Sequence, residues 1–307
     1  MKIKNIALVI MIFLLGSVVI FYTIKPQTIV TRMPAVKNEK PQLFFEISGS
    51  SKSPMKQPMG VTVNSQNKIF VADTGNQQVK IFDENGRYLS AFGKKGSDKG
   101  QFQYPYGLVT LPSGNLLVAD TVNLNIQEFD KTGKFIKTWI EKSNNIKPGA
   151  MAVDKKGKVY VSDLANHQVV VFSQGGTLEK KINNKLSKLQ YPQGIFADDN
   201  GLIWIADSGH AQIKQINSDG VIKSIILGVN DETPFGMVRG VAIDNMGRIY
   251  VSDPLSNQVS VFANDKTLLF SLPGEFYYPM GIYISDDGKI YIINRETGTI
   301  QVWGYKK

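Results

Sequence analysis

One pattern recurs six times between residues 58 and 307 of this chain and limits what the chain can fold into. In the first copy, residues 58–93, Pro-x-Gly leads into a short apolar run, a polar turn, a β-rich run that ends in Asp, and two more β-rich runs. The Gly and the Asp are 13 residues apart in four copies, and the other two keep this spacing with Ala150 for the Gly or Asn294 for the Asp. Such a constant spacing identifies a repeat protein.

Consecutive copies begin 41 to 47 residues apart, a period that suits a unit of four short strands. In the first copy these strands, named a to d, are expected at residues 60–63, 68–73, 78–82 and 88–92. The turns between a and b and between c and d are rich in Gly, Asn and Asp, the residues that tolerate a positive φ in tight hairpins. The pattern therefore predicts an all-β fold, a six-bladed β-propeller of four-stranded blades.

The two ends of the repeat region complement each other. The last copy has strands a (282–284), b (289–293) and c (299–303) but no strand d. The segment 43–47, LFFEI, reads as a strand d that has no a, b or c before it. We expect this N-terminal strand to close the last blade, because an open array, the alternative, would leave two sheet edges exposed.

The N-terminus has the features of a membrane anchor. Residues 6–24 are uncharged, and as a helix they would extend about 28 Å, close to the ~30 Å hydrocarbon core. The run is too long for a cleaved signal peptide and lacks the polar face of a buried globular helix. The sequence thus predicts a transmembrane signal-anchor helix at 1–25, a tether with three prolines at 26–41, and a propeller at 42–307 that lies outside the cytoplasm of a single-pass cell-membrane protein.

Composition excludes several classes of site. The chain has no Cys, so it has no disulfide, no thiolate metal site and no Cys nucleophile. The net charge of +9 is concentrated at the N-terminus, since from residue 42 onward 29 Lys and Arg face 25 Asp and Glu. A propeller with this mild balance does not favour a nucleic-acid partner.

The repeats resemble the NHL repeat over about residues 42–307, best in PMGVTV…IFVADTGNQQVKIF and YPYGLVT…LLVADTVNLNIQEF. Departures are Ala150, Val238 and Asn294, and also His210, Ser256 and Thr297 where the turn Asn is usual. The resemblance implies a six-bladed propeller but no single function. It keeps two alternatives open: a metal-dependent enzyme of lyase or lactonase type, and an RNA-binding domain if the propeller is cytosolic.

The residue that ends strand b recurs in every blade, and we interpret it as a structural turn residue, because chemistry seldom needs the same group six times. The set is Asp73, Asp120, Asp163, Asp207, Asp253 and Asn294. Each carboxylate is expected to accept backbone N–H bonds two or three residues further on. The only histidines, His167 and His210, lie in neighbouring b–c turns, and we expect no metal, no cofactor and no catalytic residue.

The remaining candidate is one face. In propellers the d–a and b–c loops share one side, here called the top face. The residue before each anchor Gly is expected near the axis on this side, and tyrosines of the d–a loops are expected beside it. The predicted ligand-binding residues are Met59, Tyr104, Tyr106, Tyr191, Gln193, Arg239, Tyr278 and Met280. Aromatic and cationic side chains suit a protein, a peptide or an anionic polymer, unless the aromatics pack between blades and the lysines are merely solvated.

Overall fold

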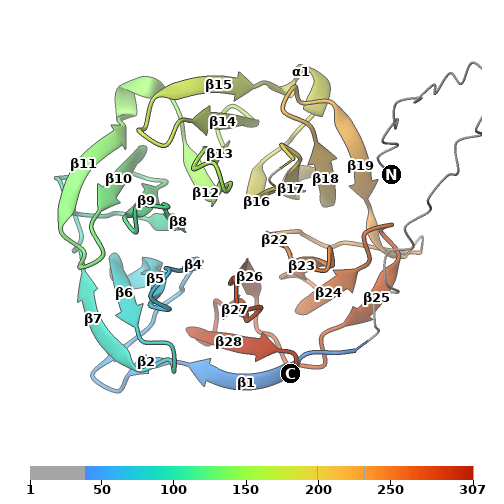
Figure 1. The fold of residues 1–307 in the computed structure, drawn as a ribbon, viewed down its shortest axis with the longest axis horizontal. Coiled ribbons are helices and arrows are strands. Elements are labelled where there is room, and N and C mark those ends of the chain that lie inside the picture. The colour runs from blue at the N-terminus through green and yellow to red at the C-terminus, as the bar shows by residue number, and fades with distance from the viewer. Residues whose placement is uncertain (1–38, 199, 231, 307) are drawn as a thin grey trace, which may run out of the picture. The chain divides into compact units, whose positions relative to one another are not determined.

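Six antiparallel four-stranded sheets follow one another along the chain and stand around a common axis, as Figure 1 shows. The computed structural model describes residues 39–198, 200–230 and 232–306. The predicted anchor at 1–25 and nearly all of the predicted tether lie outside these residues. Within them, no helix has both the length and the apolar character needed to cross a membrane. The all-β six-bladed propeller of four-stranded blades is confirmed.

The strands of each blade run from a, next to the axis, to d, at the rim. Blades 1 to 3 consist of β4 (Gly60–Val63), β5 (Ile69–Asp73), β6 (Gln78–Phe82) and β7 (Tyr88–Phe92); β8 (Pro105–Thr110), β9 (Leu116–Asp120), β10 (Asn125–Phe129) and β11 (Phe135–Ile140); and β12 (Pro148–Val153), β13 (Val159–Asp163), β14 (Gln168–Phe172) and β15 (Leu178–Ile182). Blades 4 to 6 consist of β16 (Pro192–Ala197), β17 (Ile203–Asp207), β18 (Gln212–Ile216) and β19 (Ile222–Ile226); β22 (Gly240–Ile243), β23 (Ile249–Asp253), β24 (Gln258–Phe262) and β25 (Leu268–Ser271); and β26 (Pro279–Ile284), β27 (Ile290–Asn294), β28 (Thr299–Gly304) and β1 (Gln42–Ile47).

The loops contain short elements that the sequence did not predict. Two small hairpins lie in d–a loops: β2 (Gly49–Ser50) with β3 (Ser53–Pro54), and β20 (Gly228–Asn230) with β21 (Thr233–Pro234). The helices within the described residues are the 3-10 turns η1 (Thr74–Asn76), η2 (Lys142–Asn144) and η3 (Ser208–His210) and the single-turn α1 (Asn184–Ser187). All of them belong to the d–a and b–c loops, so the irregular structure gathers on the top face.

The turn chemistry explains the hairpins on the other side. Each a–b turn contains one residue with positive φ, which is Asn67 in blade 1 and a Gly in the other five blades. The Asn64 side chain accepts the backbone N–H groups of Gln66 and Lys68 at 3.0 and 2.9 Å, which fixes the turn of blade 1. In blade 1 the observed strands match the predicted ranges, except that β5 begins one residue later, at Ile69.

The N-terminal strand closes the ring as predicted. β1 pairs antiparallel with β28, from Gln42 opposite Gly304 to Ile47 opposite Ile300. Figure 1 shows β1, in blue, beside the red strands of blade 6. The side chain of Ile47 is buried in the layer between blades 6 and 1. Residues more than 250 positions apart in the sequence therefore form one sheet.

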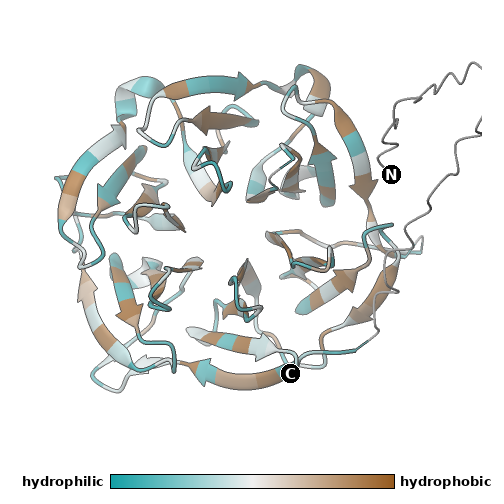
Figure 2. Cartoon of the chain, in the orientation of Figure 1, coloured by the Kyte–Doolittle hydropathy of each residue, from teal (hydrophilic) through white to brown (hydrophobic). Residues whose placement is uncertain are grey.

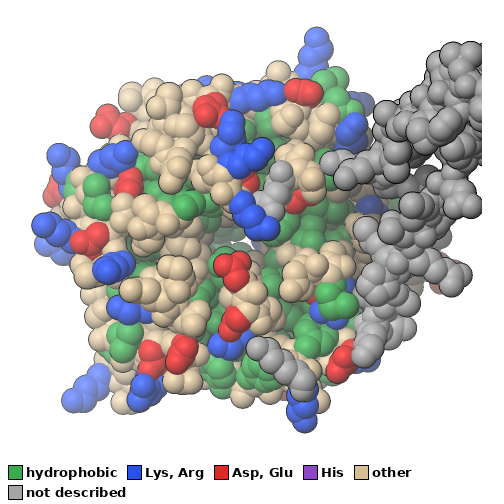
Figure 3. Space-filling view, in the orientation of Figure 1, with side chains coloured by type: hydrophobic (Ala, Val, Ile, Leu, Met, Phe, Trp, Pro, Cys, Tyr) green, Lys and Arg blue, Asp and Glu red, His purple; other side chains and the backbone are tan. Residues whose placement is uncertain are grey.

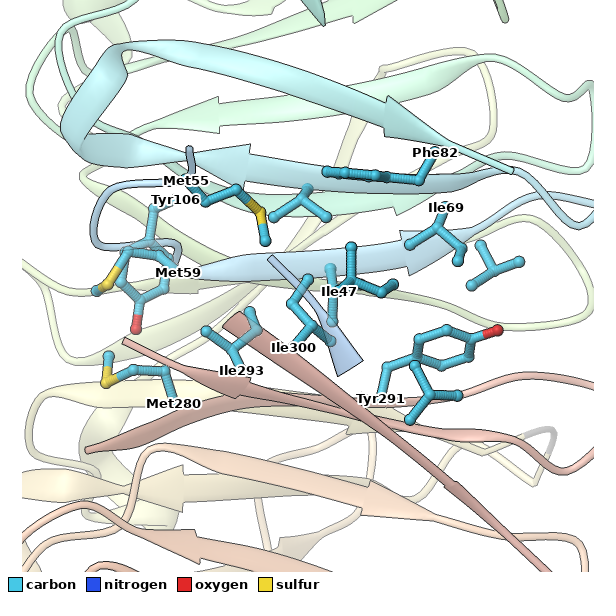
Figure 4. Packing of buried hydrophobic residues seen from close by; sticks show 14 residues of the cluster. Ile47, Met55, Met59, Ile69, Phe82, Tyr106, Met280, Tyr291, Ile293 and Ile300 are labelled. Atoms are coloured by element: carbon cyan, nitrogen blue, oxygen red, sulfur yellow. The ribbon is translucent and has the colours of Figure 1, made fainter. Parts of the chain in front are cut away.

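The core consists of apolar layers between neighbouring blades. Every residue of the b strands is buried, because both faces of each sheet pack against the next sheet. Figure 2 shows hydrophobic segments along the strands, while the turns between them are mostly hydrophilic. Figure 4 shows the layer between blades 6 and 1, where Ile47 lies close to Ile293 and Ile300.

The anchor glycines let the inner strands approach one another. A Cβ atom on Gly107 would lie 2.3 Å from the carbonyl oxygen of Gly149 in the next blade, and one on Gly60 would lie 2.2 Å from that of Tyr106. The same close approach occurs at every glycine in this repeat position. An added Cβ would lie within 3.0 Å of a carbonyl oxygen in the next blade at Gly60, Gly107, Gly194, Gly240 and Gly281. Glycine recurs here because any side chain would collide with a backbone atom that cannot rotate away.

Gly107→Ala should therefore destabilise the propeller. We expect a loss of about 1–3 kcal/mol in the free energy of unfolding, the usual cost of overpacking, measured by urea denaturation. Ala150, which occupies the same repeat position in blade 3, gives the control: Ala150→Gly should change stability by less than about 1 kcal/mol. Equal stability of Gly107→Ala and the unchanged chain would contradict this explanation of the glycines.

Candidate functional site

The residue that ends strand b joins its own turn to the loop before the blade. The Asp120 carboxylate accepts the N–H of Gln103 at 2.6 Å and that of Asn123 at 2.9 Å. In every blade the partner in the d–a loop is a backbone N–H 16 or 17 residues earlier in the sequence, and these partners are Lys56, Gln103, Lys147, Gln190, Gly236 and Tyr277. The six residues thus act across two loops on the top face.

The expected bonds within the turn form in only part of the set. Asp120, Asp163 and Asp253 accept N–H groups two or three residues further on. Asp73 and Asp207 make no such bond, and for these two the prediction of turn capping was wrong. The physical reason is that a buried lysine binds each of them instead.

Lys80 and Lys214 are those lysines, and the sequence analysis missed them. Lys80 Nζ lies 2.9 Å from Asp73 Oδ2, and both side chains are fully buried. The ammonium also donates to the carbonyl oxygens of Ser53 and Pro54, at 2.6 and 2.8 Å. The available signal was a charged residue at the third position of a strand c that is otherwise mostly apolar.

Lys214 repeats the arrangement in blade 4. Its Nζ lies 2.6 Å from Asp207 Oδ2 and donates to the Lys188 carbonyl oxygen at 2.6 Å. The uncharged Gln127 binds the d–a loop in the same way in blade 2. Its side chain accepts the N–H of Gly100 at 2.8 Å and donates to the Gln101 carbonyl oxygen at 3.0 Å. These side chains hold the d–a loops in place and so position the top face.

Both histidines have local partners. His210 Nδ1 lies 2.8 Å from Asp207 Oδ2, at the position where Asn76 binds Asp73 in blade 1. His167 Nδ1 accepts the backbone N–H of Tyr191 at 3.1 Å, and the two rings meet edge to face. Among the described residues no three His, Cys, Asp or Glu side chains are grouped as metal ligands would be.

The predicted axial residues meet in the centre of the ring. Tyr106 of blade 2 donates its hydroxyl to Gln193 Oε1 of blade 4 at 2.7 Å. The bond bypasses blade 3, whose axial residue is Gly149 and has no side chain to occupy the space. Figure 4 shows Tyr106 together with Met59 and Met280 at one end of the buried cluster. The structure therefore brings residues of four blades together at the axis.

Burial raises the pKa of the Tyr106 phenol to about 12, while the positive charge of Arg239 acts in the opposite direction. The phenol is therefore protonated at neutral pH and serves as a hydrogen-bond donor rather than as a base. The ring of Tyr104 stacks on that of Tyr106, with centroids 6.5 Å apart and an angle of 19° between the planes. Because Tyr106 is buried, the partly buried Tyr104 is the ring of this pair that is open to a ligand.

Arg239 is the charged member of this group and forms no ion pair within the described part of the chain. Its Nε is buried without a hydrogen-bond partner among these residues. An unsatisfied polar atom at this depth costs roughly 1–3 kcal/mol. We name Tyr106, Gln193 and Arg239 the axial trio.

The other predicted residues lie around the axial trio or further out. Met59 and Met280 are buried, and Tyr278 packs against the same cluster with its ring 5.7 Å from the Arg295 guanidinium. Tyr191 is 52% exposed and contacts His167 rather than the axis.

Three further aromatics of the d–a loops pack between blades, as the alternative interpretation expected for this residue type. They are Phe102, Phe235 and Phe276, and all three are buried.

The opposite face does not concentrate charge. Figure 3 views the molecule from the side on which Figure 1 draws the a–b turns in front. On this side Lys and Arg are interspersed with Asp and Glu, and cationic side chains spread over the rim. A single-signed patch of the kind that binds a nucleic-acid backbone is not seen in this view.

Comparison with known proteins agrees with the repeat pattern. The NHL repeat model matches residues 55–82, 146–172 and 189–216. The chain is 27% identical over 153 residues to Protein brain tumor of Drosophila melanogaster. The match covers 49% of this chain but only 10% of that protein.

Solved structures share the architecture. A streptogramin B lyase superposes with a TM-score of 0.61 at 17% identity, covering 83% of this chain and 81% of that chain. A virginiamycin B lyase from Staphylococcus aureus gives 0.62 at 13% identity, covering 83% and 82%. A gluconolactonase from Xanthomonas campestris gives 0.66 at 14% identity, covering 87% and 95%. At these identities the likeness shows the fold alone. The chain is a six-bladed β-propeller, three segments of which match the NHL repeat.

Proposed function

We propose that the propeller is a non-catalytic binding module that is held at a membrane by the N-terminal segment, lies outside the cytoplasm and binds its ligand at the axial end of the top face. The observation that carries this proposal is the unpaired guanidinium of Arg239 beside the Tyr106–Gln193 hydrogen bond. A half-buried cation without a protein partner is stabilised when a ligand supplies the anion.

The chemistry of the axial trio favours a peptide that presents a carboxylate. A guanidinium binds a carboxylate through two parallel hydrogen bonds, which fixes the orientation of the ligand as well as its charge. Tyr104, stacked on the buried Tyr106, gives flat apolar area next to it, as at the centres of protein interfaces. Gln193 adds an amide group that can bind a peptide backbone.

The same residues do not form a catalytic constellation. The phenol of Tyr106 holds its proton at neutral pH, and the axial trio contains no carboxylate, imidazole or thiol. Lyases and a gluconolactonase share the fold, so a metal-dependent enzyme is the rival function. Metal analysis of the purified chain decides between them, because a tightly held stoichiometric divalent ion would favour the enzyme.

Arg239→Gln should weaken peptide binding at least about tenfold, as expected when a charge-assisted hydrogen bond is lost. The full chain, purified in detergent, is tested against a peptide array whose members have a free C-terminal carboxylate, a C-terminal amide, or internal Asp and Glu. We expect the unchanged protein to prefer the carboxylate-bearing peptides, and Arg239→Gln to lose that preference. Binding constants for the best peptides are measured by fluorescence anisotropy.

Arg87→Gln is the matched control, because Arg87 is exposed in a c–d turn on the opposite face and pairs only with Asp83. This variant should bind as the unchanged protein does. Peptide binding that is equal for Arg239→Gln and the unchanged protein would contradict the proposal. So would selective capture of RNA together with a topology reporter that places the propeller in the cytosol.

A further inference from the structure

A second candidate site lies away from the axis, in a groove on the top side of blade 2. The groove has a volume of about 720 Å³, within the ~300–1,000 Å³ typical of ligand sites. It is bounded by the d–a loops on both sides of the blade and by the start of β10, and its lining residues are Ser97, Asp98, Lys99, Asn123, Asn125, Gln127, Thr138, Glu141, Lys142 and Ser143. Every one of these side chains is polar.

The charges of the lining balance. Asp98 and Glu141 oppose Lys99 and Lys142, and in the described part of the chain none of these four forms an ion pair. A groove of zero net charge gives no electrostatic preference to a strongly anionic or cationic ligand. It offers both donors and acceptors to a neutral one.

Two amide oxygens under the groove lack a donor from the described residues. They are Asn123 Oδ1 and Asn125 Oδ1, and both are buried. The Asn123 amide is fixed, because its Nδ2 donates to the Gly96 carbonyl oxygen and to Asp120 Oδ2, each at 2.9 Å. Asn125 has no such restraint, and its broad χ2 torsion allows the amide to turn toward the groove. Once turned toward the groove, the Asn125 oxygen would be stabilised by a donor that a ligand supplies.

The repeat pattern explains why the groove lies in this blade. Four other blades have Gln at the position of Asn125, and the sixth has Thr299. In two of these blades the amide, one methylene further out, reaches a partner: Gln168 Nε2 donates to Asp163 Oδ2 at 2.9 Å and Gln258 Nε2 donates to Ser271 Oγ at 2.7 Å. The shorter Asn125 leaves both the space and an unpaired oxygen.

We propose that this groove binds a saccharide. A neutral ligand that carries many hydroxyl groups donates to the Asn125 amide oxygen and to the carboxylates of Asp98 and Glu141. The same hydroxyl groups accept from the ammonium groups of Lys99 and Lys142. The site is separate from the axial trio, so the chain would carry two ligands on one face.

Asn125→Gln tests the proposal, since it restores the residue of the other blades and should leave the fold intact. The full chain is purified in a detergent without a sugar headgroup and titrated by calorimetry with maltotetraose, cellotetraose and chitotetraose. We expect at least one tetrasaccharide to bind at a single site, and Asn125→Gln to weaken that binding about tenfold or abolish it. The melting temperature should stay unchanged.

Two controls separate this site from others. Gln78→Asn makes the reverse change at the same repeat position of blade 1 and should leave saccharide binding unaltered. Arg239→Gln should also leave it unaltered, which keeps the result independent of the axial proposal. The inference is overturned if none of the three tetrasaccharides binds the unchanged chain at millimolar concentration, or if Asn125→Gln binds as tightly as the unchanged chain does.

Discussion

Deletion of residues 42–47 should abolish cooperative folding of the whole propeller rather than destabilise blade 6 alone. The deletion removes the entire β1 ladder with β28 and the buried side chain of Ile47. Loss of a buried Ile alone costs about 2–5 kcal/mol, and the exposed edge of β28 adds to it. Since domains are stable by only about 5–15 kcal/mol, we expect the melting transition to fall by at least about 10 °C or to disappear in calorimetry.

Leu43→Ser is the matched control within the same strand. Leu43 pairs with Trp303 through its backbone, but its side chain is 47% exposed. This variant keeps the ladder and should change the free energy of unfolding by no more than about 0.5 kcal/mol, as surface substitutions usually do. A deletion variant that melts at the temperature of the unchanged chain would refute closure by β1 as a requirement of the fold.

Lys80→Met should destabilise the propeller by about 3–5 kcal/mol, because it leaves the buried Asp73 carboxylate without its counter-ion. Both side chains are fully buried, with Lys80 Nζ 2.9 Å from Asp73 Oδ2. The Ser53 and Pro54 carbonyl oxygens lose their donor at the same time. The d–a loop before blade 1 should therefore become more accessible to protease, as well as the whole domain less stable to urea.

A double-mutant cycle identifies the cause. The double variant Lys80→Met with Asp73→Asn removes the stranded charge, and its Asn side chain can still accept a loop N–H, as Asn294 does from Tyr277 at 3.2 Å. The double variant should thus be more stable than Lys80→Met alone by more than about 1 kcal/mol. Lys180→Met is the control and should be neutral, because Lys180 and its ion-pair partner Asp219 are both exposed. A Lys80→Met chain as stable as this control would disprove the role of the buried pair.

The sequence alone predicted the blade count, the strand positions and the closure. These features depend on short-range rules: a turn that needs positive φ takes Gly or Asn, and a strand packed on both faces is apolar. The sequence showed that the glycine of Pro-x-Gly recurs, but only the structure explains why glycine is needed there. At Gly107 an added Cβ would collide with the Gly149 carbonyl oxygen of the next blade.

The repeat also predicted which residues lie at the axis, since every blade places the residue before its anchor glycine there. It did not predict which of them touch. Tyr106 reaches Gln193 because Gly149, between them, leaves the space open, and Arg239 Nε is buried without a partner among the described residues. Contacts across a ring depend on the sizes of side chains in several blades at once, which no single repeat contains.

The buried lysines are a second feature whose contacts the repeat pattern could not predict. Lys80 is placed on β6 by the repeat, but its carbonyl partners Ser53 and Pro54 lie 27 and 26 residues away in a loop without periodicity. The local sequence pattern determined the propeller fold, because strand propensity, turn geometry and the alternation of side chains act within a few residues. Only the tertiary structure determined the contacts within the axial trio and the groove of blade 2, because both depend on which side chains of different loops and blades remain unpaired once the ring has closed.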